Sequence, residues 1–140
     1  MLPLPMRRRL LPLILVMLGS AAGCADRLPD QDLRILQAVP VAKLSTDILW
    51  QEYQKDRKAA DGRYWGKAVE VTGKVTSVAK DPPARILFVP SESAAGVQAG
   101  LLDDRATATL ADAAAGQRIT LRCFCEGLAT HVILKSCIKP

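Results

Sequence analysis

The sequence predicts a small, mainly β domain in which one N-terminal α-helix precedes five strands that close into a barrel. Three observations support this prediction. Residues 45–61 have apolar side chains at helical spacing and contain neither Pro nor Gly. From residue 68 onward the apolar residues alternate with polar ones, as in a half-buried strand. The later strands are short and rich in small and β-branched residues, and closing such strands into a barrel removes exposed edges.

The first 23 residues have the three parts of a secretory signal. Arg7–Arg9 form a basic stretch, Leu10–Leu18 form an apolar run, and Gly19–Gly23 are all small. A membrane-spanning helix needs about 20 apolar residues, so this run is too short to cross a bilayer. A buried core helix is the alternative, but it would leave the basic stretch unexplained. We therefore expect residues 1–23 to be a signal peptide.

The stretch SAAGC, which ends at Cys24, resembles the lipobox of bacterial lipoproteins, with Ala21 where Leu is usual. The resemblance implies that the Cys24 thiol receives a diacylglyceryl group and that the leader is cut before it. Several acyl chains would then hold the protein on a membrane. Ala25 stands where an Asp would favour inner-membrane retention, which favours the periplasmic face of the outer membrane. The alternative is an ordinary signal peptide, with Cys24 free or disulfide-bonded.

Residues 24–44 are predicted to be a lipid-anchored spacer that separates the membrane from a domain spanning residues 45–140. The segment contains Pro29 and Pro40, alternating charges and no sustained hydrophobic period. Its apolar residues would form one short amphipathic turn against the domain: Leu33, Leu36 and Val39.

The elements of the domain follow from local signals. Ser45 begins the helix as a cap, and Gly62 is expected to end it. Residues 68–78 form the longest predicted strand, in which Gly73 suggests a bulge or a sharp bend. The other strands are expected at 85–90, at 105–110 and, on either side of Gly127, within 118–138, with a small-residue excursion over 91–104.

Two stretches of the chain resemble the tRNA_anti-like family of small OB-fold domains: EYQKDRKAADGRYWGKAVEVTGKVTSV, from Glu52, and AGQRITLRCFCEGLATHVILKSCI, from Ala115. The resemblance implies a five-stranded OB-fold barrel; such domains are often found on bacterial lipoproteins. The chain departs from the family pattern at Asp56, where Asn is usual, and at Cys123, where Gly is common. The resemblance covers residues 45–139 and is carried by Tyr53, Ala59–Asp61, Tyr64, Gly66, Lys67, Val71, Gly73, Gly116, Cys125, Gly127, Leu134 and Cys137.

The resemblance also implies a disulfide between Cys125 and Cys137, and an exported domain lies in an oxidising compartment. A tight hairpin at residues 126–130 would, however, separate these two cysteines by about 20 Å, which is beyond disulfide reach. Buried free thiols are therefore the alternative. A zinc site made by these two cysteines, Cys123 and His131 is disfavoured, because Cys-x-Cys on a strand lacks the usual ligand spacing. We expect neither a metal nor a cofactor.

The net charge of +5 does not by itself indicate a nucleic-acid ligand. Arg7–Arg9 lie in the leader, which has no acidic residue, so the rest of the chain carries 16 basic and 14 acidic side chains. The expected partners are a membrane, through the N-terminal lipid, and an envelope protein or glycan. Nucleic acid is disfavoured, because aromatic residues make up only 4% of the chain and single-strand binding relies on stacking aromatics.

The sequence contains no recognised catalytic motif, and its one histidine, His131, is not part of a nucleophile signature. We therefore expect a non-catalytic binding or adaptor module. The alternatives are an oligosaccharide- or nucleic-acid-binding domain and a thiol- or metal-dependent enzyme that uses Cys125. OB-folds bind oligomers on their second and third strands and the adjoining loops, and this region offers four candidate ligand residues: Lys80, Arg85, Phe88 and Arg105.

Overall fold

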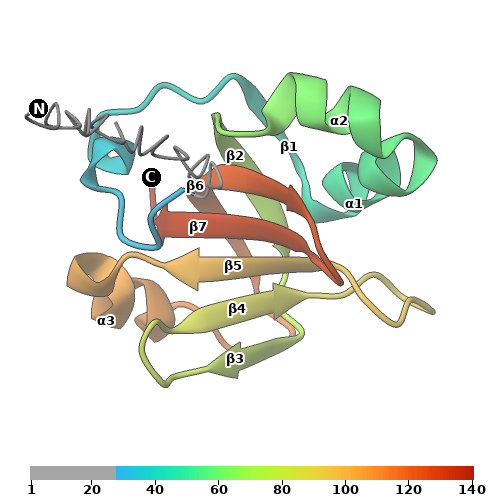
Figure 1. Ribbon diagram of the computed structural model, residues 1–140. Helices are drawn as coiled ribbons and strands as arrows, with labels where there is room; N and C mark the ends of the chain where they lie inside the picture. The colour runs from blue at the N-terminus through green and yellow to red at the C-terminus, as the bar shows by residue number, and fades with distance from the viewer. Residues whose placement is uncertain (1–27) are drawn as a thin grey trace, which may run out of the picture.

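The structure, a computed structural model, describes residues 28–140, so the predicted signal peptide and Cys24 lie outside the described residues. Within residues 28–140 the fold is mainly β, as predicted, but it has seven strands instead of five and three α-helices instead of one (Figure 1). None of these helices is long and apolar enough to cross a bilayer. The elements are the 3₁₀ turn η1 (Leu33–Leu36), the helices α1 (Thr46–Lys55), α2 (Arg57–Tyr64) and α3 (Asp103–Ala111), and the strands β1 (Ala42–Ser45), β2 (Ala68–Lys74), β3 (Ser77–Ala79), β4 (Arg85–Phe88), β5 (Val97–Leu101), β6 (Arg118–Leu128) and β7 (Val132–Ile138).

The seven-stranded sheet is curled into a half-barrel, and the chain passes directly from β2, near one edge of the sheet, to β3 at the other edge. Its strand order is β1-β2-β6-β7-β5-β4-β3, and only Val75 and Thr76 separate β2 from β3. The Val75 amide donates to the carbonyl of Gln117 at 2.8 Å, whereas the Thr76 amide donates to that of Leu87 on β4, also at 2.8 Å. The chain therefore changes its pairing partner within two residues. The long bent strand predicted over residues 68–78 is present as β2 and β3, divided at this point.

Gly73 allows close packing inside the barrel. Its pairing with Ile119 is regular, so the predicted bulge is absent at Gly73, and the chain changes its pairing partner at Val75 and Thr76 instead. A Cβ atom at residue 73 would lie 2.1 Å from Oγ1 of Thr46 and 3.0 Å from Cδ1 of Phe88. The first turn of α1 and the Phe88 ring thus occupy the space that a side chain at residue 73 would need, which explains why this residue is a glycine.

The single helix predicted over residues 45–61 is two helices that meet at Asp56. This residue has extended backbone angles (φ −159°, ψ 96°), and its side chain accepts a hydrogen bond from the Ala59 amide at 3.0 Å. An acidic side chain that caps a helix in this way competes with continuation of the preceding one. The second helix, α2, also continues past Gly62, the predicted end, to Tyr64.

The strand predicted at residues 105–110 is instead helix α3, and β5 lies in the stretch predicted to be an excursion. Asp103 and Asp104 occupy the first turn of α3, where negative charge is favoured by the helix dipole. The short alternation of Ala and Thr at residues 105–110 was thus the basis of a wrong strand prediction, because these residues are helical. In β5, Val97, Ala99 and Leu101 are buried in alternation with less buried neighbours.

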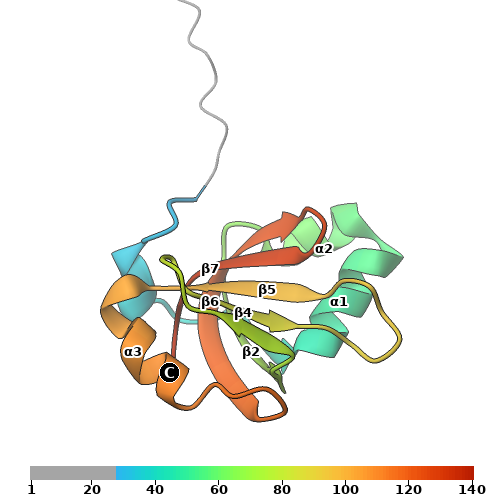
Figure 2. The same ribbon diagram turned by 90° about the horizontal axis from the view of Figure 1, so that it is seen from below.

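The described part of the predicted spacer, residues 28–44, is packed on the barrel, which corrects the domain boundary at residue 45 (Figure 2). Strand β1 pairs in parallel with β2, and Ile35 of η1 is completely buried. Ile35 packs with residues on the outer surface of the sheet: Ala68, Leu102, Phe124 and Ile138. The face expected to pack is instead exposed, with exposed fractions of 58% for Leu33, 37% for Leu36 and 84% for Val39.

Candidate functional site

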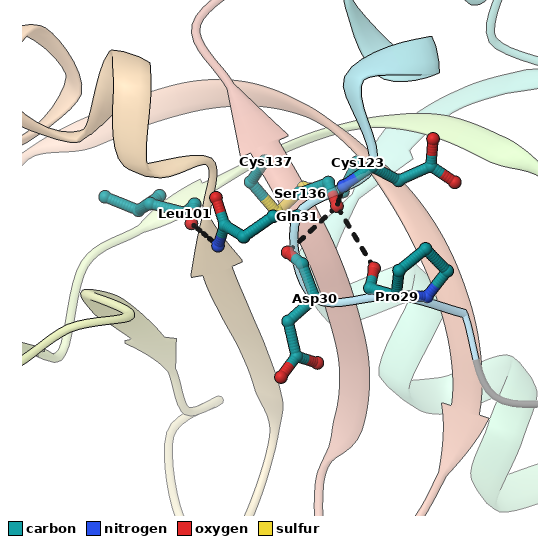
Figure 3. Close-up of a disulfide and its surroundings, with 8 residues drawn as sticks. Pro29, Asp30, Gln31, Leu101, Cys123, Ser136 and Cys137 are labelled. Atoms are coloured by element: carbon teal, nitrogen blue, oxygen red, sulfur yellow. Dashed lines mark hydrogen bonds between the residues drawn. A yellow bond between two sulfur atoms is a disulfide. The ribbon is translucent and has the colours of Figure 1, made fainter.

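The structure pairs Cys123 with Cys137 and leaves Cys125 as a buried free thiol, so the Cys125–Cys137 pairing is wrong (Figure 3). Cys125 lies opposite Leu134 in the β6–β7 register. Two residues of β7, Ser136 and Cys137, face the single residue Cys123, and Ser136 has a positive φ of 56°. This bulge brings the Cα atoms of Cys123 and Cys137 to 4.2 Å.

Cys125 belongs to a buried polar network that ties the helices to the barrel. The Tyr53 hydroxyl lies 3.5 Å from the Cys125 sulfur and donates to the Asp61 carboxylate at 2.9 Å. Burial raises the pKa of the Cys125 thiol, and its hydrogen bond with Tyr53 offsets this only in part. The thiol is therefore protonated and inaccessible near neutral pH, which is unfavourable for a nucleophile. The family positions Tyr53, Asp61 and Cys125 thus have a structural role here.

Within residues 28–140, the three cysteines and His131 do not form a metal centre. The ring nitrogen Nδ1 of His131 accepts a hydrogen bond from the Gly96 amide at 3.1 Å, which holds the β6–β7 turn against the loop before β5. Over residues 28–140 no group of three or more His, Cys, Asp or Glu side chains could hold a metal ion. Cys123 and Cys137 are engaged in the disulfide.

The four predicted ligand residues do not form one surface. Arg85 is exposed on β4 and borders a hollow of about 150 Å³ together with Gln98 of β5 and Lys135 of β7. Phe88 is only 2% exposed and lies in the core, because a spacing of three residues places it on the opposite face of β4 from Arg85. Its assignment to a ligand face is therefore wrong. Lys80 and Arg105 are both exposed, but neither borders this hollow.

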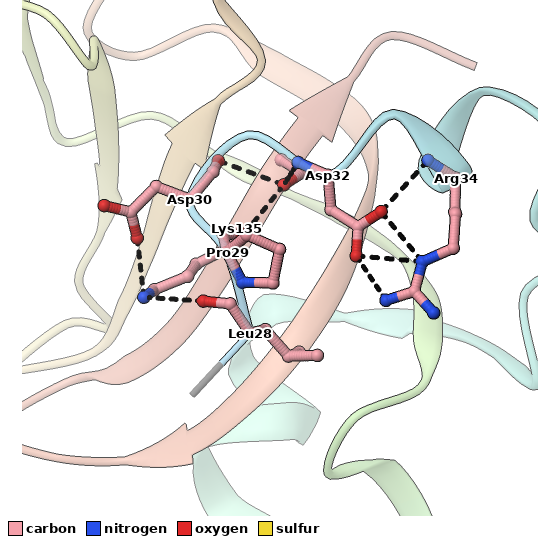
Figure 4. Close-up of polar contacts among 7 residues, drawn as sticks. Leu28, Pro29, Asp30, Asp32, Arg34 and Lys135 are labelled. Carbon is pink, nitrogen blue, oxygen red and sulfur yellow. Dashed lines mark hydrogen bonds and ion pairs between the residues drawn. The ribbon is translucent and has the colours of Figure 1, made fainter. Parts of the chain in front are cut away.

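The charge of Lys135 within this hollow is compensated by two carboxylates. Its Nζ lies 2.6 Å from Oδ1 of Asp30 and 2.5 Å from Oε2 of Glu126 (Figure 4 shows the first contact). Burial by itself lowers the pKa of Lys135, but hydrogen bonds to both carboxylates outweigh burial, so the pKa is raised. Lys135 is thus charged but already paired, and it serves to fix the N-terminal segment.

A larger hollow lies at the start of β6, between α3, β6 and the C-terminus. It has a volume of about 620 Å³, within the range of typical ligand sites. Arg118 borders both this hollow and a second one of about 220 Å³. We call these two hollows together the Arg118 cleft. The polar residues of the larger hollow supply hydroxyl, amide and charged groups: Thr109, Asp112, Gln117, Arg118, Thr120 and Lys139.

Arg118 lies directly opposite Lys74 in the β2–β6 register, and both side chains are exposed. Neither forms an ion pair with a described residue, whereas Lys139 pairs with Asp112. Like charges facing one another across two strands are unfavourable, so an anion between them would be stabilising. Sequence reasoning missed both residues, because they meet only through the pairing of β2 with β6 and because α3 was predicted to be a strand.

The fold is similar to that of a lipoprotein from Klebsiella pneumoniae subsp. pneumoniae MGH 78578, known from a crystal structure and provisionally described as nucleic acid-binding. The two structures have a TM-score of 0.53 at 14% sequence identity, over 79% of this chain and 97% of that chain. At this identity the likeness concerns the fold. Among curated proteins no sequence relative matches. The tRNA_anti-like family model matches residues 1–138, and the chain therefore belongs to the tRNA_anti-like family.

Proposed function

We propose that this protein is a lipid-anchored, non-catalytic binding module of the cell envelope, built on an OB-fold barrel. The strand order of the sheet carries the proposal. If β2 and β3 are counted as one bent strand, then β4, β5, β6 and β7 complete a five-stranded closed set, to which β1 is added. Strands β5 and β7 pair in parallel within it, and α3 connects β5 to β6. Barrels of this class bind oligonucleotides and oligosaccharides.

The anchor follows from the leader and Cys24. A basic stretch, a short apolar run and small residues precede the cysteine, and the structural neighbour is also described as a lipoprotein. Ala25 after the cysteine favours the periplasmic face of the outer membrane. A protein held there would meet envelope glycans and envelope proteins.

The Arg118 cleft supports an anionic envelope glycan as the ligand. Arg118 and Lys74 supply two cations without a described ion-pair partner, and the neighbouring hydroxyl and amide groups match sugar hydroxyls and acetamido groups. The larger hollow is bordered by no aromatic residue of the described chain. A site of this kind favours charge and hydrogen bonding over the base stacking used for single-stranded nucleic acid.

Nucleic acid is the second candidate, and the description of the Klebsiella lipoprotein favours it. The same two cations would then contact phosphates. Affinity for nucleic acid would fall steeply with salt, because neutralising phosphates releases counterions. Phe88 borders the smaller hollow of the cleft, but its ring is only 2% exposed and offers little surface on which a base could stack, which counts against this candidate.

Fluorescence anisotropy on the mature protein in detergent micelles would separate the two candidates. The probes are a labelled soluble peptidoglycan fragment that carries carboxylates and a labelled single-stranded DNA oligomer. We expect the glycan fragment to bind, and Arg118→Ala to weaken its binding about tenfold, the effect of losing one charge-assisted hydrogen bond. The matched control is Arg105→Ala on α3, outside the cleft, which should bind as the wild type does. Tighter, salt-sensitive binding of the DNA would favour the second candidate, and binding of neither probe at low salt would contradict the proposal.

A further inference from the structure

The N-terminal segment is fixed to the barrel from its first described residue. The Leu28 carbonyl accepts a hydrogen bond from Nζ of Lys135 at 3.4 Å, and the Asp30 carboxylate pairs with the same nitrogen. The Asp32 amide donates to Oγ of Ser136 at 2.8 Å, and that hydroxyl donates to the Asp30 carbonyl at 3.0 Å. These contacts, part of which Figure 4 shows, hold the segment against β7 beside the disulfide.

A second set of contacts extends this attachment to β5 and α3. The side-chain amide of Gln31 donates to the Leu101 carbonyl at 3.2 Å, and its oxygen accepts from the Asp103 amide at 2.7 Å (Figure 3 shows the first contact). Ile35 is fully buried a few residues further on. The segment is thus attached to the barrel at several points before β1 begins, and its start has a defined place on the surface.

This attachment leaves a very short connection to a lipid at residue 24. From Cys24 to Leu28 there are only four residue steps, and fully extended chain spans at most about 3.3–3.6 Å per residue, so the connection reaches at most about 14 Å. A folded domain of about 100 residues has a radius of gyration of about 13 Å, so its diameter is at least about twice that value and exceeds the length of this connection. The barrel cannot turn the surface around Leu28 away from the bilayer.

Two residues after Leu28, Asp30 borders a small hollow on the outer face of β4, β5 and β7, which we call the β4–β5–β7 face. Its small hollow is bordered by Asp30 and Lys135, which hold the N-terminal segment, and by Arg85 and Gln98. Arg85 is exposed and forms no ion pair with a described residue, so it can meet an anionic headgroup. The connection between α3 and β6 lies on the far side of the barrel from the start of the described chain, as Figure 2 shows.

We propose that the lipid at Cys24 holds the β4–β5–β7 face against the phospholipid headgroups and leaves the Arg118 cleft open to the periplasm. This proposal rests on the lipid anchor of the proposed function. OB-folds commonly bind oligomers on the face formed by their second and third strands, which are β4 and β5 here. The membrane would then cover this face, and the Arg118 cleft would remain accessible to a macromolecule.

The proposal is tested with the lipidated full-length mature protein in vesicles of phosphatidylethanolamine and anionic phosphatidylglycerol. One variant, Gln98→Cys, places an environment-sensitive fluorophore on the β4–β5–β7 face. The matched control, Ala115→Cys, places it in the exposed α3–β6 connection. Cys125 is buried and will not compete for the label. A nitroxide on the lipid headgroups should quench the label at residue 98 several-fold more than the label at residue 115.

A second form of each variant carries a Gly/Ser linker of about 20 residues between Arg27 and Leu28, with a root-mean-square span of about 25 Å. This linker should remove the difference between the two positions. Equal quenching with the native connection, or stronger quenching at residue 115, would overturn the orientation. The mass of each purified protein is measured first: a chain without lipid would overturn the anchor and the orientation together, whereas a lipidated chain with equal quenching would overturn the orientation alone.

Discussion

Replacing Phe88 with alanine is expected to lower the free energy of unfolding by about 3–5 kcal/mol, the range for truncating a buried aromatic ring. The ring is 2% exposed and packs beside Gly73 and the first turn of α1. Denaturant unfolding of the wild type and the variant measures the loss. Leu87→Ala is the matched control: Leu87 is half-buried next to Phe88 on the opposite face of β4, so it should cost much less.

The same variant decides between core and ligand roles for Phe88. Phe88 also borders the smaller hollow of the Arg118 cleft, but not the larger one. If its ring acts only through the core, folded Phe88→Ala protein should bind the glycan fragment with wild-type affinity under conditions where it remains native. A variant with unchanged stability but lost binding would contradict the structure and place Phe88 on a ligand surface.

Replacing both Cys123 and Cys137 with alanine should lower the free energy of unfolding by about 3 kcal/mol, the loop-entropy value for a loop of about 15 residues. The two cysteines are separated by 14 residues in sequence. The disulfide also holds the β7 bulge whose Ser136 binds the N-terminal segment. Denaturant midpoints of the wild type with and without reductant, compared with those of the double variant, measure the effect.

Cys125→Ala is the control for this prediction, because it removes a buried thiol and leaves the disulfide in place. Alkylation of denatured, unreduced wild type, followed by peptide mass analysis, should modify Cys125 and leave Cys123 and Cys137 unmodified. Alkylation of Cys123 with Cys125 protected would contradict the pairing in the structure.

Part of the fold was predictable because its signals are local. Alternation over residues 68–78 predicts the long strand that appears as β2 and β3, and Ser45 does cap the first helix. The division of the helix at Asp56 also has a local cause, since an acidic cap followed by a short helix is a recognisable pattern. Asp56 also fits the helical spacing of residues 45–61, which is why a single helix was predicted there.

Other features depend on long-range packing. The bulge at Ser136 has no signal in the sequence, yet it decides which cysteine Cys137 reaches. In the N-terminal segment Ile35 packs instead of Leu33 and Leu36, because its position relative to the outer face of β6 and β7 is set by tertiary contacts. The composition of residues 24–44 predicted a spacer. Prolines and mixed charge do not distinguish a spacer from extended chain that is packed on a domain.

The candidate site was the least predictable part. Arg85, predicted as a ligand residue, is exposed, but its position beside the start of the N-terminal segment follows from contacts between residues more than 100 positions apart. The Arg118 cleft combines α3, β6 and the C-terminus, and α3 was predicted to be a strand. Without the helix no cleft could be foreseen there.

Metabolic labelling with radioactive palmitate is the most direct test of the lipid anchor, on which the compartment and the orientation at the membrane both depend. We expect the wild-type chain to incorporate label and to fractionate with the envelope at a mass that shows loss of residues 1–23. Cys24→Ser should incorporate none. An unlabelled wild-type chain recovered from the cytosol with its leader still attached would contradict the account.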